Sequence, residues 1–214
     1  MKRLVYLYCL LAFFLINNQI IAKNILYRSL KEGLGIRAMS MGRAYTAVAE
    51  GSSAGYYNPA GVGKPGGMYK YENLDFKNTN YDTFYHHSVY ASPFEFQHWK
   101  NVDKNGDTIE VNAYSFGKRG RKAIDWGVTY KSVLEKYSGY QTTGWSTDIG
   151  LLVHLSQNID LGFQGRDVFK QNVKIPTTAS FGASVFTLSK DFVIASDILT
   201  IRDQGKFAFY THVG

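Results

Sequence analysis

The sequence predicts an all-β protein, an antiparallel transmembrane β-barrel of about nine strands with an N-terminal plug. Three observations support this fold class. Residues 67–214 alternate apolar with polar side chains at period two, as half-buried strands require. Aromatic residues make up 15% of the chain and include 16 tyrosines, which suits strands that are apolar on one face. A glycine-rich stretch, Gly33–Gly66, separates these strands from an apolar N-terminus.

Residues 1–22 have the composition of a secretory signal peptide. A basic start at Lys2 and Arg3 precedes the apolar run Leu4–Ile16, and Ala22 is a small residue suited to cleavage. The run is shorter than the roughly 20 residues of a membrane-spanning helix. We expect a cleaved signal; the alternative is an uncleaved anchor. The only cysteine, Cys9, lies inside this run, so the mature chain would lack disulfides and thiolate chemistry.

Nine segments after residue 66 carry strand-like alternation, and no amphipathic helix of ordinary length is expected among them. The clearest is the hairpin around Ser156–Asn158, where both strands place aliphatic or aromatic residues on one face. The expected strands are Met68–Phe76, Thr83–Ala91, Thr108–Gly117, Ile124–Lys131, Thr147–Leu155, Ile159–Arg166, Thr177–Thr187, Phe192–Thr200 and Phe207–Val213. Long connections are expected at Ser92–Asp107 and Leu134–Thr147, alternating with short turns, as in outer-membrane barrels.

The residues on the two faces of these strands separate a membrane barrel from a soluble sandwich or lipocalin-like barrel. One face carries Ile, Leu, Val, Phe and Trp. The opposite face carries Asp125, Lys131, Asp148, His154, Asp160, Gln164 and Arg166. So much charge is unsuited to a soluble core and is typical of a wet lumen. We therefore favour the membrane barrel over the soluble β-domain.

The stretch Gly35–Gly63 resembles the N-terminal signature of a superfamily of outer-membrane barrels. The matching residues include Arg37-Ala38, Met41-Gly42, Ala47-Val48-Ala49 and Asn58-Pro59-Ala60-Gly61. The superfamily contains the long-chain fatty-acid transporters (FadL-like) and the type IX secretion barrels (PorV/PorQ-like). The resemblance implies three parts: signal peptide 1–22, hatch segment 23–66 inside the barrel, and barrel strands 67–214. The alternative for the glycine-rich stretch is a surface loop.

The resemblance also implies a function and a location. The protein would lie in the bacterial outer membrane among its lipids and would bind or pass hydrophobic compounds such as long-chain fatty acids. The alternative is a non-transporting partner of secretion-system proteins. Family barrels have more strands and a terminal aromatic residue, so we expect a truncated member or a further strand near Asn24–Lys31.

Candidate site residues follow from the strand phases and from the resemblance. The hatch motif comprises Arg37, Met41, Gly42, Asn58, Pro59, Ala60 and Gly61. Asp125, Asp148, Asp160 and Arg166 would face the lumen, lining a polar path or pairing with Arg37 and Arg43. Candidates for contact with a hydrophobic ligand are Met39, Met41, Tyr56 and Tyr57. Packing of the plug is the simpler explanation for these four.

Two enzyme motifs occur by chance within the glycine-rich stretch. Gly51–Gly55 fits G-x-S-x-G without the preceding strand of a hydrolase, and Gly61–Gly66 fits G-x-G-x-x-G without a following helix. His86 and His87 are adjacent and would point to opposite faces of a strand. We therefore expect no enzyme activity, no metal and no cofactor. Basic residues cluster only at Lys118–Lys122, in an expected turn, so no nucleic-acid partner is predicted.

Overall fold

The computed structural model describes most of the chain after the N-terminal region. The described residues are 34–64, 70–77, 83–103, 105–120, 123–137, 139–173, 175–187, 192–203 and 206–214. The expected signal peptide, the segment Asn24–Lys31 and the turn at Pro65–Gly66 lie outside them. Within these ranges, no helix has the length and apolar character needed to cross a bilayer.

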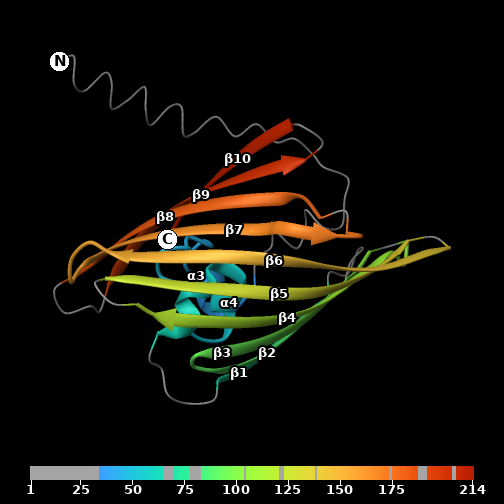
Figure 1. Cartoon of the computed structure of the whole chain (residues 1–214), viewed down its shortest axis with the longest axis horizontal. Coiled ribbons are helices and arrows are strands. Elements are labelled where there is room, and N and C mark those ends of the chain that lie inside the picture. Colours follow the sequence, from blue (N-terminus) through green and yellow to red (C-terminus); the bar gives the residue numbers. More distant parts are fainter. Residues whose placement is uncertain are drawn as a thin grey trace.

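The described strands form one antiparallel sheet in which each strand pairs with its neighbours in sequence (Figure 1). They are β1 (Lys70–Lys77), β2 (Thr83–Ala91), β3 (Phe94–Val102), β4 (Thr108–Arg119), β5 (Ile124–Tyr137), β6 (Tyr140–His154), β7 (Ile159–Gln171), β8 (Thr177–Phe186), β9 (Val193–Asp203) and β10 (Lys206–Val213). The all-β class is therefore confirmed. Over the described residues the sheet is open, with β1 and β10 at its two edges, and no barrel closure is seen among them.

Two predictions about the connections were wrong. The expected loop Ser92–Asp107 contains β3, which makes ten strands instead of nine. The expected loop Leu134–Thr147 is a continuation of β5 and β6, which pair as far as Tyr137 and Tyr140. The polar residues of 134–147 belong to the ends of β5 and β6, which extend past the apolar part of the sheet. The predicted alternation of long loops with short turns is absent among the described residues.

Residues 34–64, the N-terminal segment, pack against one face of the sheet, which we call the inner face (Figure 1). The segment contains only short helical turns: α3 (Ile36–Ser40), η1 (Gly51–Ser53), α4 (Ala54–Tyr57) and η2 (Pro59–Gly63). Its contacts are concentrated on β4, β5 and β6, which η2 crosses. Segment and sheet share one apolar cluster, in which Tyr45, Val48 and Tyr57 pack with Trp99 and Val133.

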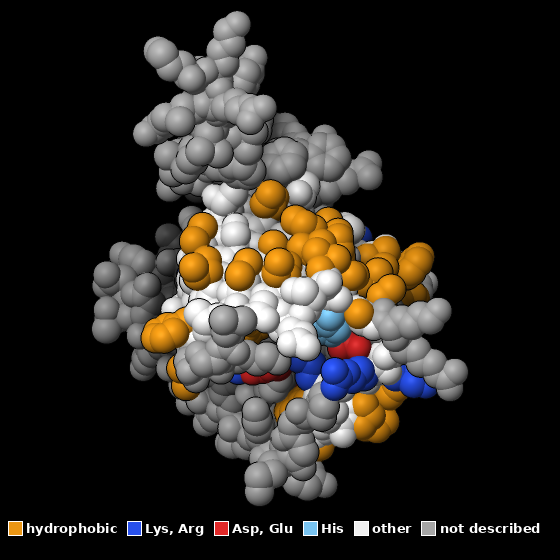
Figure 2. Space-filling model, turned by 90° about the vertical axis from the view of Figure 1, so that its left-hand side faces the viewer, with side chains coloured by type: hydrophobic (Ala, Val, Ile, Leu, Met, Phe, Trp, Pro, Cys, Tyr) orange, Lys and Arg blue, Asp and Glu red, His pale blue; other side chains and the backbone are white. Residues whose placement is uncertain are grey.

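The outer face of the sheet carries a wide apolar surface. Its exposed side chains include Tyr114, Ile124, Trp126, Val128, Tyr130, Ile149, Leu151, Ile159, Phe163, Phe181, Val185 and Ile194. Figure 2, which looks along the strands, shows hydrophobic side chains near the periphery and Lys, Arg, acidic and His side chains closer to the middle. The alternation in sequence therefore correctly predicted which residues lie on the outer face.

Candidate functional site

The inner face holds the N-terminal segment by its main chain. The Asp197 carboxylate on β9 accepts hydrogen bonds from the amides of Tyr45 and Thr46, each at 2.8 Å. On β3, Glu95 accepts the amide of Gly55 at 2.6 Å. Both carboxylates are at most 3% exposed. Hydrogen bonds to a charged acceptor are stronger than neutral ones, so these two carboxylates anchor the middle of the segment to strands on opposite sides of the sheet.

Asn58 sits where the segment crosses β6. Its backbone is extended, as expected before Pro59, and its side-chain oxygen caps η2 by accepting the amide of Ala60 at 3.1 Å. Its Nδ2 donates to the carbonyl of Thr46 at 2.9 Å and to that of Leu151 at 3.0 Å. The Asn-Pro pair thus ends α4, starts η2 and ties both to the sheet.

A row of glycines on the inner face lets the segment approach the sheet backbone closely. Gly117, Gly127 and Gly150 are direct cross-strand partners on β4, β5 and β6. Gly162 and Gly182 pair in the same way on β7 and β8. A Cβ at Gly127 would lie 2.2 Å from the carbonyl oxygen of Pro59, and one at Gly162 would lie 2.2 Å from that of Thr46. We call these five residues the glycine row; side chains there would displace the segment.

A buried charge network lies beside this row, on β5, β6 and β7. Lys131 forms ion pairs with Asp148, at 2.7 Å, and with Asp167. Asp167 also accepts from Ser146 Oγ at 2.7 Å, and its amide donates to Asp148 at 2.8 Å. The β6–β7 register shifts between Thr147 and Ile149, and Asp167 has a φ of 56°. This irregularity turns the Asp167 side chain to the inner face next to that of Arg166.

Arg166 contacts Tyr56 of the segment in two ways. Its Nη2 donates to the Tyr56 carbonyl at 2.6 Å, an oxygen that also accepts from Gln164 at 2.8 Å. Its guanidinium carbon lies 4.1 Å from the centre of the Tyr56 ring, in a cation–π arrangement. Tyr56 in turn packs edge-on against Tyr57 and Trp99. The aromatic pair is therefore fixed between the sheet and the charge network.

Burial also affects the tyrosine hydroxyls of the segment. It raises the pKa of Tyr56, an effect that the nearby Arg166 partly offsets. It likewise raises the pKa of Tyr57, whose hydroxyl accepts the amide of Leu34 at 3.0 Å. Both side chains are therefore neutral hydrogen-bonding groups at ordinary pH.

A second polar cluster lies where β6 ends and β5 and β7 begin. His154 contacts Asp160 through Nδ1 at 2.7 Å and Asp125 through Nε2 at 3.0 Å. Asp125 also accepts the amide of Gly120 at 3.1 Å, in the turn that follows β4. These contacts join three strands at one rim of the sheet.

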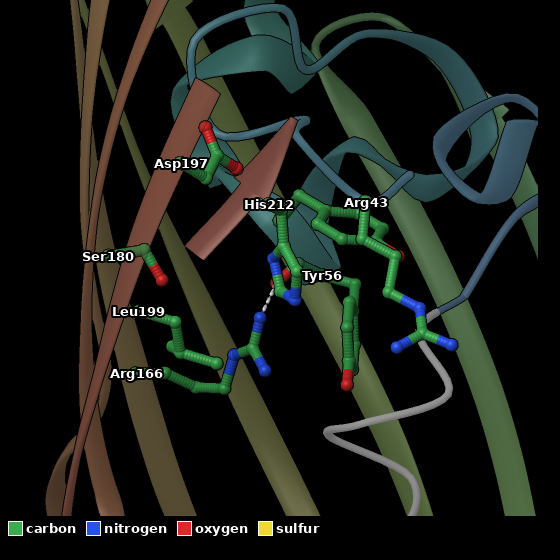
Figure 3. Close-up of a pocket in the computed structure, with 8 residues that line it drawn as sticks. Arg43, Tyr56, Arg166, Ser180, Asp197, Leu199 and His212 are labelled. Carbon is green, nitrogen blue, oxygen red and sulfur yellow. Dashed lines mark hydrogen bonds between the residues drawn. The ribbon is translucent and has the colours of Figure 1, made fainter. Parts of the chain in front are cut away.

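A small cleft opens between the segment and β7–β10 (Figure 3). It has room for about one or two water molecules. Its lining consists of Arg43, Tyr56, Tyr57, Arg166, Ser180, Asp197, Leu199 and His212. In Figure 3, Arg43 comes from the segment and Arg166 from the sheet, and the rings of His212 and Tyr56 are drawn between their guanidinium groups.

The predicted site residues are only partly brought together. Asp125, Asp148, Asp160 and Arg166 all lie on the inner face, each at most 8% exposed. In the described residues, however, none pairs with Arg37 or Arg43: the acids pair with Lys131 or His154 instead, and Arg37 pairs with Glu50. Pairing with the segment arginines, one of the two predicted alternatives, is thus not seen among the described residues, where the acids have closer partners on neighbouring strands.

The four candidate ligand contacts divide into two pairs. Tyr56 and Tyr57 line the cleft, whereas Met39 and Met41 are not among its lining residues. Met41 packs against the apolar cluster, and its carbonyl lies beside Gly214. Of the hatch motif, Asn58, Pro59, Ala60 and Gly61 are buried on the sheet, while Arg37 and Gly42 are exposed.

Several functional contacts were not singled out from the sequence. Asp197 lies in a predicted strand, and the alternation with Ile194 and Ile198 would have assigned it to the polar face. Glu95 was missed together with its strand β3. Asp167 follows an irregularity that no period-two pattern reveals. Among the described residues, no group of His, Cys, Asp and Glu side chains is arranged to hold a metal ion.

Comparisons with family models, with curated proteins and with solved structures found no match for the chain.

Proposed function

We propose that the protein is a bacterial outer-membrane β-barrel protein in which the N-terminal segment acts as a plug. Its function would be to bind or pass hydrophobic small molecules, such as long-chain fatty acids, across that membrane. The single observation that carries this proposal is the distribution of side chains across the sheet, with apolar residues exposed on one face and charged residues buried on the other.

That distribution is the reverse of what a soluble β-sandwich requires. Ile149, Leu151 and Phe163 are between 42% and 47% exposed, while Lys131 and Asp148, on the opposite face, are at most 3% exposed. Lipid would remove the apolar residues from water, at about 25 cal/mol per Å² of apolar surface buried. Polar interior and apolar exterior faces are the pattern of membrane barrels.

The plug part of the proposal is supported by the way the segment is held. Its amides and carbonyls bond to Asp197, Glu95, Gln164 and Arg166 of the sheet, and its backbone follows the glycine row. A ligand would pass only if part of this interface separates. The cleft, with room for one or two water molecules, is a place where the interface is not filled.

A second candidate function follows from the same contacts. Because so many buried hydrogen bonds hold the segment, it would remain in place in a barrel that does not transport. Such a protein would serve as an outer-membrane partner of secretion-system proteins.

Uptake by reconstituted protein separates the two candidates. Lipid vesicles that contain the folded full chain are expected to take up labelled oleate faster than vesicles that contain heat-denatured protein. No uptake by correctly folded protein would refute the transport proposal and leave the second candidate.

A reversible crosslink tests whether the segment must move. A Cβ at Gly55 would lie 2.9 Å from that of Ser115, so a shift of about 1 Å would reach the usual disulfide separation. In a chain with the sole native cysteine, Cys9, changed to Ser, the variant Gly55→Cys/Ser115→Cys should lose oleate uptake when oxidised. Reduction should restore it. Equal uptake in both redox states would contradict gating by the segment.

A further inference from the structure

We infer that the cleft between the N-terminal segment and β7–β10 is a carboxylate-binding site, with Arg166 and Arg43 as its cationic groups. This inference rests on the proposed function and specifies the part of the ligand that the protein would recognise. The cleft would bind the carboxylate head group of an amphipathic acid and not its hydrocarbon tail.

Arg166 is buried without a salt bridge to a carboxylate. Its side chain is 6% exposed and donates hydrogen bonds to the Tyr56 carbonyl and, at 3.3 Å, to the Gln164 amide oxygen. Its Nε has no hydrogen-bond partner. Among the described residues Arg166 forms no ion pair, and buried guanidinium groups are normally paired with anions. A donor therefore remains free beside the cleft.

The nearby acids are held mainly by groups other than the two arginines. Asp148 and Asp167 share Lys131. Asp197 lines the cleft; its Oδ2 accepts the amides of Tyr45 and Thr46, while its Oδ1 has no hydrogen-bond partner. In Figure 3 its carboxylate lies toward the segment and away from the guanidinium of Arg166.

The cleft has the composition and size that suit a carboxylate. Its lining carries two arginines against one carboxylate, with Ser180 and His212 as further polar groups. Arg43 makes no ion pair with any other residue that the structure describes. Room for one or two waters matches a carboxylate group, whose two oxygens accept from arginine with favourable geometry. Tyr56 and Leu199 would contact the first carbons attached to it.

Two sources supply this chemistry, namely a long-chain fatty acid and a short organic acid. Equilibrium binding of labelled oleate and labelled butyrate to the folded full chain in detergent distinguishes them. Oleyl alcohol serves as the uncharged analogue. The variants are Arg43→Gln and Arg166→Gln, and Arg119→Gln is the control because Arg119 is exposed at the end of β4, outside the cleft lining.

We expect the wild type to bind oleate, and each cleft variant to bind it at least about tenfold more weakly, as loss of a charge-assisted contact implies. Arg119→Gln should bind it normally, and oleyl alcohol should be bound equally weakly by all four proteins. Arginine-dependent binding of butyrate alone would support the site and assign it to short acids. If Arg166→Gln does not fold, oleate binding by Arg43→Gln tests the site instead. Arg43 is only partly buried, so its substitution is expected to leave the fold intact.

Two results would overturn the inference: no binding of either acid by the folded wild type, or unchanged binding by the folded variants. Failure of the transport proposal gives a different outcome, in which the acids bind through the arginines but vesicles show no uptake. Uptake that is insensitive to both arginine substitutions would retain transport and reject the site.

Discussion

Asp197 accepts a hydrogen bond from the backbone amide of Tyr45 at 2.8 Å, across 152 positions of sequence. The contact joins the penultimate strand of the sheet to the N-terminal segment, so the segment can adopt its place only when β9 is in position. Its neighbour Thr46 donates to the same oxygen, which makes the carboxylate a double acceptor.

Removing this acceptor should destabilise the folded protein. Asp197→Ala leaves two buried amides without a partner, and we expect a loss of about 3 kcal/mol in the free energy of unfolding. Asp197→Asn keeps an acceptor oxygen and should lose about 1 kcal/mol. Urea unfolding followed by tryptophan fluorescence measures both. An alanine variant as stable as the wild type would show that the contact contributes nothing.

The glycine row predicts a contrast between two glycines on adjacent strands. Gly150→Ala would place a Cβ 2.1 Å from Asn58 Oδ1, and we expect a cost of at least about 2 kcal/mol. Gly165→Ala is the matched control, because its closest neighbour, at 2.8 Å, is a Val168 methyl group that can shift. It should cost less than about 1 kcal/mol. Equal midpoints of urea unfolding for the two variants would argue against close contact of the segment with β6.

Removing the Lys131 side chain should cost more stability than its two ion pairs contribute to the wild type, because both acids stay buried. Lys131→Met leaves Asp148 and Asp167 buried without their cation, which should cost about 3–5 kcal/mol. Adding Asp148→Asn removes one of the two charges and should recover part of the loss. Thermal unfolding by circular dichroism compares the single and double variants. A double variant less stable than the single one would contradict this electrostatic explanation.

The buried tyrosines predict weaker folding at alkaline pH. Because burial raises the pKa of Tyr57 above the unfolded value of about 10, the folded state keeps its proton longer than the unfolded state. Stability should therefore be complete below about pH 10 and fall above it, by about 1 kcal/mol per pH unit for each such group. Urea midpoints at pH 8 and pH 11 test this. Tyr57→Phe should show a smaller decrease than the wild type; an identical decrease would exclude Tyr57 as a source.

Sequence predicted the strands well where one face is continuously apolar. In β5 and β6, Val128 and Ile149 alternate with Thr129 and Asp148, and the structure gives this phase. It failed for β3, where Phe94 and Phe96 are followed on the same face by His98 and Lys100, so neither face shows a continuous apolar pattern. Strands that extend past the apolar surface lose the signal on which the prediction depends.

The candidate site was less predictable than the fold, for a physical reason. Strand phase assigns a residue to a face but does not determine its partner. Asp148 was predicted to line a polar path or to pair with arginines of the segment, and in the structure it pairs with Lys131 on the adjoining strand. The segment itself is held through main-chain groups, and its glycines and alanines carry no side-chain pattern that would have revealed Asp197 or Glu95 as acceptors.

Spin-label accessibility tests most directly whether the outer face of the sheet is exposed to lipid. Single cysteines at Leu151, Leu152 and Val153, introduced with Cys9 changed to Ser, would be spin-labelled in lipid vesicles. Oxygen, which concentrates in lipid, should relax the label at Leu151 and Val153 more than at Leu152, which is fully buried on the inner face. A water-soluble nickel complex should have little effect at Leu151. Strong relaxation by nickel and weak relaxation by oxygen at Leu151 would contradict the account.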